Sequence, residues 1–193
     1  MAKDNSNLIN MSVTLFLITA ISAVVLASVY SLTKEPIAQA KAQKLETAVQ
    51  NVMPEFDRLE QKEIPAFDMP KKTLLLNIAY KGDEIVGYAI NSYTNKGFSG
   101  DINVMVGLLT DGTINDTYVL EHKETPGLGT KMSDDKFRNQ FKGLDPTTKK
   151  LYVKKDGGDV DAITAATISS RAFCDALNRA IETLKTTEGK KNE

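Results

Sequence analysis

An uncharged apolar stretch near the start of the chain limits its fold more than any other feature. No charged residue occurs from Leu8 to Leu32. Because a helix rises about 1.5 Å per residue, a helix of this length crosses a hydrocarbon layer of about 30 Å with some tilt. A cleaved signal peptide is the alternative, but its apolar region usually spans only about 7–15 residues. The stretch therefore predicts a retained transmembrane helix in contact with the lipid bilayer, and residues 1–33 are expected to form the N-terminus and membrane anchor.

The lysines that flank this stretch bear on its orientation. Lys3 precedes it, whereas Lys34, Lys41 and Lys44 follow it. Because positive residues tend to stay on the cytoplasmic side, this distribution slightly favours a cytoplasmic C-terminal part.

The rest of the chain is long enough for one domain of ordinary size, and its composition excludes several classes of site. Among 193 residues, 25 are acidic and 24 are lysine or arginine, so the charge balance gives no reason to expect nucleic acid as a partner. The single cysteine, Cys174, cannot hold an iron–sulfur cluster alone. The single histidine, His122, excludes a multi-histidine metal site. No metal site is expected.

Hydrophobic spacing predicts an α+β fold built on an antiparallel sheet. Pro36 suits the first turn of a helix that follows helical spacing to Val52, and the anchor is expected to continue into it. Alternating residues around short turns indicate about four strands in two hairpins. These strands are expected at residues 73–80, 84–93, 102–108 and 114–120.

The remaining elements are expected to cover or connect this sheet. Three prolines in residues 53–70 indicate an irregular connection. Ser133 is a candidate cap for a short helix that contains Phe137 and Phe141. Apolar residues at helical spacing between Phe173 and Leu184 predict a helix over the sheet. Residues 151–153 and 160–163 are short strand candidates. The expected domains are a juxtamembrane helix and connection (34–70), a globular domain (71–187) and a disordered tail (188–193).

Small and hydroxyl residues from Asp161 to Ser170 immediately precede this last helix. A helix that begins near Ile168 leaves backbone N–H groups unpaired in its first turn, and its positive end favours an anion. Thr167 lies at that end, which suggests a phosphate site. The plain alternative is that Thr164 and Thr167 are helix caps.

A second unusual stretch runs from Glu124 to Gly129, directly after the last predicted strand. Thr125-Pro126-Gly127-Leu128 fits a type II turn, since proline presets φ at the second position and glycine accepts a positive φ at the third. Such a turn exposes backbone amides and lets a flat ring approach the main chain. A plain surface turn is the alternative.

The two motifs resemble those of FMN-binding domains in membrane redox complexes. Asp161-x-x-Thr164-x-Ala166-Thr167 is similar to their flavinylation motif, and the sequence from Glu124 to Gly129 is similar to a second signature. Behind one N-terminal anchor, these motifs resemble the G subunit of the Rnf electron transport complex. The C subunit of the sodium-pumping NADH:quinone reductase has the same layout and is the second choice.

The resemblance implies a covalent FMN site. Thr167 matches the threonine that bears FMN through a phosphoester bond. The other implied cofactor-binding residues are Glu124, Thr125, Gly127, Leu128, Thr164, Ala165, Ala166, Ser170 and, on a looser match, Phe98. A separate flavin transferase is expected to recognise Asp161, Thr164, Ala166 and Thr167. The chain departs from the pattern at Ala162 and Ala165, where many members have glycine. Because alanine allows fewer backbone conformations than glycine, a strained turn at Ala165 is less favoured, but both alanines are small and modification is still expected.

The leading hypothesis is an electron-relay subunit of an Rnf complex, which couples ferredoxin oxidation and NAD⁺ reduction to ion transport. The resemblance implies no catalytic residue in this chain, other Rnf subunits as partners, and a single-pass protein of the inner (cytoplasmic) membrane. It places the N-terminus in the cytoplasm and the soluble domain on the periplasmic or outer face, against the lysine distribution. A membrane-anchored binding or assembly subunit without flavin is a further alternative, suggested by Ala162 and Ala165.

Overall fold

The first element of the computed structural model, which describes residues 4–69 and 71–189, is a long helix, α1 (Asp4–Val52). It contains Pro36 without interruption, so the expected continuation of the anchor into the next helix is confirmed. Within the described residues, α1 is the one helix long and apolar enough to cross a membrane. Its large apolar side chains between Leu8 and Leu32 are exposed. Hydroxyls such as those of Thr14 and Ser28 donate to carbonyls four residues earlier, which satisfies them inside the helix.

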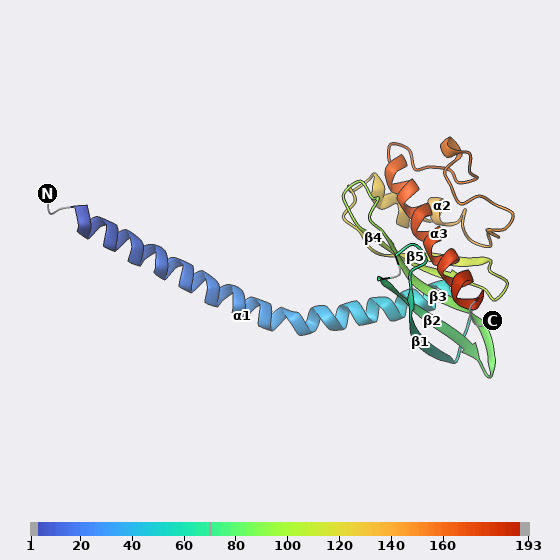
Figure 1. Cartoon of the computed structure of the whole chain (residues 1–193), viewed down its shortest axis with the longest axis horizontal. Coiled ribbons are helices and arrows are strands. Elements are labelled where there is room, and N and C mark those ends of the chain that lie inside the picture. Colours follow the sequence, from blue (N-terminus) through green and yellow to red (C-terminus); the bar gives the residue numbers. More distant parts are fainter. Residues whose placement is uncertain (1–3, 70, 190–193) are drawn as a thin grey trace. The chain divides into compact units, whose positions relative to one another are not determined.

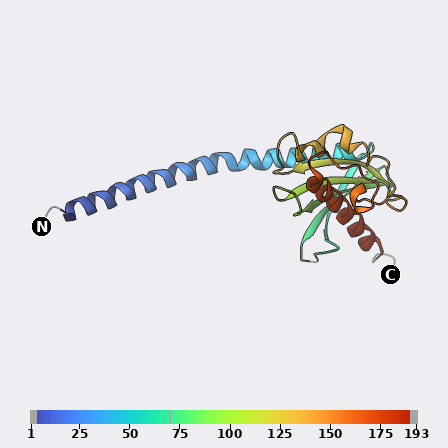
Figure 2. The same cartoon turned by 90° about the horizontal axis from the view of Figure 1, so that it is seen from above.

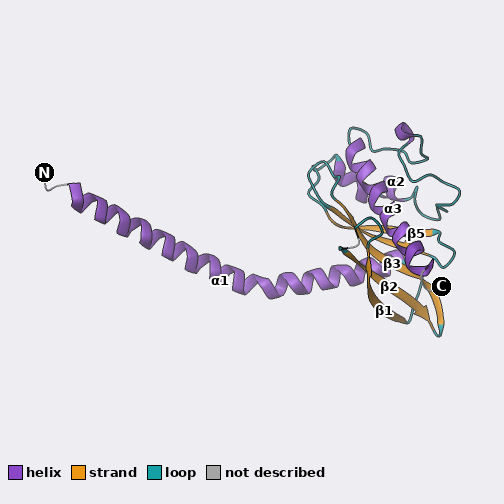
Figure 3. Cartoon of the chain, viewed as in Figure 1, coloured by secondary structure: helices purple, strands orange, loops and turns teal. Residues whose placement is uncertain are grey.

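The chain divides into two compact units, residues 1–44 and 45–193, and the second contains a five-stranded sheet. Figure 3 shows these strands in orange. Every neighbouring pair is antiparallel, and the strands follow one another in sequence order. They are β1 (Arg58–Pro65), β2 (Thr73–Lys81), β3 (Glu84–Thr94), β4 (Ile102–Leu108) and β5 (Ile114–Glu121). The predicted α+β class with an antiparallel sheet is confirmed.

β1 was not expected, because its residues were assigned to an irregular connection. Most of its side chains are exposed, so it lacks the apolar alternation that marks a half-buried strand. It lies at the edge of the sheet, where a proline such as Pro65 is tolerated. Charged residues on such a strand discourage pairing with other chains.

The two faces of the sheet pack against different elements. On one face, Ile102, Val104, Val106 and Leu108 of β4 join the larger core, whereas Met105 points to a smaller core on the other face. This alternation follows from the two-residue period of a strand.

The larger core is closed by α3 (Thr167–Gly189), which lies across the sheet in Figure 1 and Figure 2. The Ser92 hydroxyl of β3 donates to the Ala176 carbonyl at 2.7 Å. Phe173 packs with Phe137 and Phe141, with ring centroids 5.1–5.3 Å apart. Hence α3 is fixed both to the sheet and to the segment before it.

Three short elements connect β5 to α3. They are η1 (Gly129–Ser133), α2 (Asp135–Arg138) and η2 (Lys154–Asp156). Asp134, rather than Ser133, occupies the N-cap position of α2. The two short strand candidates form only an isolated parallel bridge between Val153 and Val160. α3 continues through residues 188–189 of the expected tail, and residues 190–193 lie outside the described residues.

The smaller core is covered by the last turns of α1, which belong to the second unit. The side-chain amide of Asn115 donates to the Val52 carbonyl at 2.8 Å and caps this helix end. The same carbonyl lies directly over Gly107 of β4, where an added Cβ would be 2.0 Å from it. The helix can approach the sheet this closely because residue 107 has no side chain.

We expect Gly107→Ala to destabilise the second unit by about 1–3 kcal/mol, because the helix end must move away from the sheet. Thermal unfolding of the detergent-solubilised protein, followed by circular dichroism, measures this effect. Gly189→Ala is the matched control, since nothing lies within 4 Å of its added Cβ. Equal melting temperatures for the two variants would contradict the close contact.

Candidate functional site

A cavity of about 310 Å³ lies where three segments meet at the start of α3. One segment follows β3, one follows β5, and the third leads into α3 itself. The cavity is lined by Phe98, Glu124, Thr125, Leu128, Gly129, Ala165, Ala166, Thr167, Ile168 and Ser169. The fold therefore brings the two sequence motifs to one site, with Phe98 beside them.

The carboxylate of Glu124 joins these three segments. Its side chain is buried, with 5% of the residue exposed. One carboxylate oxygen, Oε2, accepts a hydrogen bond from the Ser169 hydroxyl at 2.7 Å, and Oε1 accepts one from the Ser99 backbone N–H at 3.1 Å. Glu124 thus ties the segments after β3 and β5 to the first turn of α3.

Two glycines leave room for this carboxylate. A Cβ added to Gly97 would lie 2.2 Å from the Gly100 carbonyl oxygen and 2.7 Å from Oε1 of Glu124, and one added to Gly129 would lie 2.5 Å from Oε2. These distances are too short for a real side chain, so these positions need glycine for close approach rather than for an unusual backbone angle.

The turn after Glu124 has the geometry that the sequence predicts. Gly127 has a φ of +76°, and the Leu128 N–H donates to the Thr125 carbonyl at 3.2 Å. However, the Gly127 N–H donates to the Thr130 hydroxyl at 3.0 Å, so it does not point freely at a ligand. Thr125 and Leu128 line the cavity, whereas Gly127 shapes the turn without lining it.

The loop before α3 contains strained backbone at Ala165. Its φ is +62°, and no other non-glycine residue among the described residues has a positive φ. An alanine in this left-handed region costs about 1–2 kcal/mol. The alanine therefore adopts the conformation that glycine would take more easily.

Two hydrogen bonds of Ser170 close this loop. Its hydroxyl accepts from the Ile163 N–H at 2.9 Å and donates to the Ala166 carbonyl at 3.0 Å. Ser170 is fully buried and does not line the cavity. The neighbouring Ser169 lines the cavity instead.

Thr167 is the first residue of α3, is half-buried, and lines the cavity. The first bond of the α-helical pattern runs from the Ser170 N–H to the Ala166 carbonyl at 3.0 Å. The N–H groups of Thr167, Ile168 and Ser169 precede that bond, as the first-turn donors of a helix do. An anion attached to Thr167 would lie at the positive end of the α3 dipole.

Asp161 and Thr164 lie beside a different cavity, of about 440 Å³. Both are exposed, while Ala166 is buried. The Asp161 carboxylate pairs with Lys154 at 2.7 Å. Its backbone N–H and carbonyl both bond to the side-chain amide of Gln140, at 2.8 and 3.2 Å. The structure therefore separates these two exposed residues from those around Thr167.

The rim of the 310 Å³ cavity is apolar and exposed. Phe98 is 67% exposed, Ile168 46% and Leu128 39%. A planar apolar ring can cover such side chains, while the Thr167 hydroxyl and the helix start suit a phosphate ester. The residues present thus fit FMN. No group of three or more potential metal ligands occurs among residues 4–69 and 71–189.

Several residues of this site were not predicted. Ile168 and Ser169 follow Thr167 in the sequence, and their positions in the first turn of a predicted helix were the available signal. Ser99 contributes a backbone N–H, which side-chain patterns do not reveal. Gly129 was part of the second motif, but its contact with Glu124 depends on the fold.

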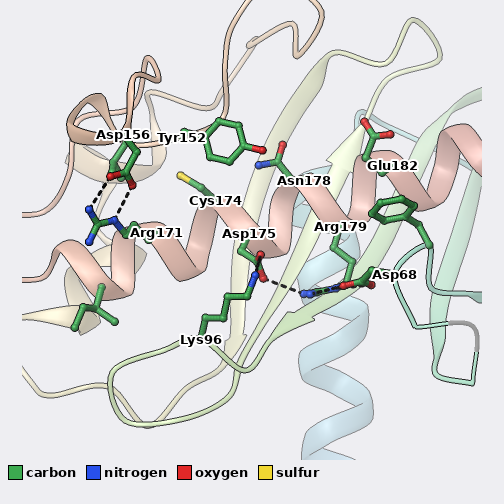
Figure 4. Close-up of a pocket in the computed structure, with 13 residues that line it drawn as sticks. Asp68, Lys96, Tyr152, Asp156, Arg171, Cys174, Asp175, Asn178, Arg179 and Glu182 are labelled. Atoms are coloured by element: carbon green, nitrogen blue, oxygen red, sulfur yellow. Dashed lines mark hydrogen bonds and ion pairs between the residues drawn. The ribbon is translucent and has the colours of Figure 1, made fainter.

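A larger groove of about 570 Å³ follows the outer side of α3, as Figure 4 shows, and shares Ile168 with the smaller cavity. Arg179 is buried there. It donates to both carboxylate oxygens of Asp68 at 2.8–3.0 Å and to the Tyr93 carbonyl. Arg171 forms a bidentate pair with Asp156, with both distances 2.7 Å. The groove is therefore lined largely by charges that pair with one another.

These ion pairs change the pKa values of carboxyl groups in the groove. Hydrogen bonds from Arg179 hold the pKa of Asp68 below its usual value. Burial alone would raise the pKa of Asp175, but hydrogen bonds from Lys96 and Thr94 and the charge of Arg179 lower it overall. Burial raises the pKa of the Cys174 thiol to about 12, so Cys174 behaves as a core side chain.

Family models match most of the chain. One, described as an FMN-binding domain, matches residues 97–182, and another, described as an RnfG N-terminal region, matches residues 1–52. The first contains every residue that lines the 310 Å³ cavity.

Relatives of known name match over nearly the whole length. The chain is 31% identical to the G subunit of the ion-translocating oxidoreductase complex of Methanosarcina acetivorans, over 96% of this chain and 99% of the relative. It is 30% identical to the G subunit of the proton-translocating ferredoxin:NAD(+) oxidoreductase complex of Clostridium ljungdahlii, over 98% of each. The C subunit of the Na(+)-translocating NADH-quinone reductase from Parabacteroides distasonis is a solved structure with 21% identity and a TM-score of 0.48, covering 73% of this chain and 80% of that chain.

We expect Ala165→Gly to stabilise the protein by about 1 kcal/mol, because it relieves the positive φ of alanine. Ala162→Gly is the matched control, since Ala162 has a negative φ, and there glycine should lower stability by about 0.5–1 kcal/mol. Thermal unfolding of both variants measures the difference. A loss of stability in both would show that Ala165 is not strained.

The lowered pKa of Asp68 predicts a dependence of stability on acid pH. A carboxyl whose pKa is lower when folded stabilises the fold fully above its unfolded pKa, near 3.8, and this contribution is lost as pH falls through the folded value. We therefore expect Asp68→Asn to lower the melting temperature at pH 7 and to flatten its decline below about pH 4. Asp83→Asn changes an exposed carboxylate in a turn, and its melting temperature should match that of the wild type at pH 7 and below about pH 4. If the melting temperature of Asp68→Asn falls with pH as steeply as that of the wild type, the Asp68 carboxylate is not the group responsible.

Proposed function

Since the chain belongs to the family of G subunits of ion-translocating Rnf oxidoreductase complexes, we propose that it carries FMN on Thr167 through a phosphoester bond. The family makes it an electron-transfer subunit with an FMN-binding domain. The observation that carries the covalent site is the position of Thr167, which begins α3 and faces the cavity walled by Glu124, Thr125 and Leu128.

The chain supplies the binding site but not the activation of Thr167. A threonine hydroxyl is a weak nucleophile unless a base takes its proton. The carboxylate in the cavity, Glu124, is already hydrogen-bonded to Ser99 and Ser169. We therefore assign the attachment to a separate Mg²⁺-dependent flavin transferase. In that reaction the Thr167 oxygen would bond to the FMN phosphorus of FAD, the pyrophosphate bond would break with AMP as the leaving group, and the hydroxyl proton would pass to the transferase.

The exposed side chains of Asp161 and Thr164 suit recognition by that transferase, together with Thr167. Ala166, which is buried, would contribute through its packing. Ser170 is assigned to closing the loop, because its hydroxyl is occupied by Ile163 and Ala166. When bound, FMN supplies a ring that accepts and donates electrons, and the rim residues Phe98, Leu128 and Ile168 shield it from water.

The membrane arrangement follows the same proposal. α1 anchors the chain in the bilayer as a single-pass protein of the cytoplasmic membrane, with other Rnf subunits as partners. The N-terminus would lie in the cytoplasm and the FMN-binding domain on the outer face. A covalent bond is useful there, because lost FMN would not be replaced from a cytoplasmic pool.

Two alternatives receive less support. Membership of a quinone reductase is disfavoured by the near full-length match to two G subunits of the Rnf type. A role without flavin was suggested by alanine in place of glycine, but Ala165 adopts a positive φ, a conformation that glycine takes more easily.

We expect the wild-type protein, expressed with its transferase, to exceed its sequence mass by one esterified FMN and to fluoresce as a denatured band on a gel. Thr167→Ala should lose both signals completely, because the bonding oxygen is absent. Thr187→Ala, on the same helix and away from the cavity, is the matched control and should keep both. Fluorescence of a denatured Thr167→Ala band would place the flavin elsewhere, and an unmodified wild-type mass would favour the role without flavin.

A further inference from the structure

Glu124 is a buried charge in the wall of the proposed flavin cavity. Both of its carboxylate oxygens accept hydrogen bonds, one from a hydroxyl and one from a backbone N–H. A carboxylate has acceptor oxygens on both sides, which matches these two hydrogen bonds. The two partners, Ser169 and Ser99, are neutral, and they stabilise the charge without cancelling it.

Two lysines, Lys96 and Lys154, pair with carboxylates other than Glu124. Lys96, close to Phe98 in the sequence, pairs with Asp175 at 2.5 Å. Lys154 pairs with Asp161 at 2.7 Å. The positive end of α3 would be shared between Glu124 and a phosphate on Thr167. A ring in the cavity would therefore lie beside a negative charge that is only partly compensated.

We propose that Glu124 lowers the reduction potential of the flavin. This inference rests on the proposed function, since it requires FMN on Thr167. Each electron that a redox partner gives to the ring adds one negative charge, unless a proton from water follows it. The fixed carboxylate repels that charge, and the repulsion is stronger in a partly buried site than in water. The oxidised ring is thereby favoured.

The burial of Glu124 supports a role beyond holding the loops. A neutral glutamine could make similar contacts, because its oxygen accepts from the Ser99 N–H and its amide donates to the Ser169 oxygen. Burying an ionised carboxylate is costlier than burying such an amide. The negative charge of Glu124 is therefore separable from its hydrogen bonds. The Glu124→Gln substitution removes the charge and keeps the shape of the side chain.

The test compares reduction potentials of the full-length, detergent-solubilised protein that carries covalent flavin. Intact mass first establishes one FMN on the wild type; without it the proposed function fails before this inference is reached. Spectroelectrochemical titration then compares wild type, Glu124→Gln and the control Glu84→Gln, which removes an exposed charge at the start of β3. We expect a more positive midpoint for Glu124→Gln and no shift for Glu84→Gln.

A further variant separates charge from loop position. Ser169→Ala removes one hydrogen bond and keeps the charge, so its midpoint should not become more positive. The inference is overturned if Glu124→Gln has the wild-type midpoint, or if Ser169→Ala shifts as far in the positive direction. It is also overturned if folded Glu124→Gln accepts no flavin, because the carboxylate would then serve attachment.

A second pair of variants covers the case in which Glu124→Gln does not fold. Leu128→Glu adds a carboxylate at the exposed rim of the same cavity, and Leu128→Gln is its uncharged match. We expect a more negative midpoint for Leu128→Glu than for Leu128→Gln. Equal midpoints would show that a charge in this wall does not act on the ring, and would overturn the inference.

Discussion

The site depends on one buried carboxylate that holds together segments from distant parts of the chain. Glu124 receives hydrogen bonds from Ser99, after β3, and from Ser169, in the first turn of α3. Leaving the buried Ser169 hydroxyl without this acceptor would cost about 1–3 kcal/mol. The geometry also explains two glycines whose backbone angles are unremarkable, because Gly97 and Gly129 yield their side-chain space to the carboxylate. This junction therefore forms part of the cavity wall.

The sheet supports this junction, and a different helix packs on each of its two faces. α3 packs on one face through the larger core, while the last turns of α1 pack on the other through the smaller one. Both contacts are close: Ser92 bonds to the backbone of α3, and Gly107 lies under the end of α1. A change in the packing of residues 45–53 therefore reaches β4 directly, and β4 faces α3 on its opposite side.

The sequence predicted elements whose signals are local. The apolar stretch of α1, the alternation in β4 and the helical spacing in α3 were each visible, and the type II turn at Gly127 follows from its own residues. β1 was missed because an exposed edge strand has no apolar period. Motif resemblance indicated that Glu124 and Thr167 serve one flavin site, but the hydrogen bonds that join their segments required the fold. The roles of Ser169 and Ser170 could not be separated, because adjacent hydroxyls differ only in the direction that the helix gives them.

The position of Thr167 has a consequence for electron transfer that does not depend on the chemistry of the ring. α3 is anchored by Phe173, Ala176 and Leu177, which are fully buried, so its first residue is held by the domain core. The rim, in contrast, consists of exposed side chains such as Phe98. A flavin attached at Thr167 would be held at its phosphate by a helix packed into the domain core and bordered at its ring by exposed side chains. Such an arrangement holds the carrier in place while leaving one side of the cavity accessible to a redox partner, which an electron relay requires.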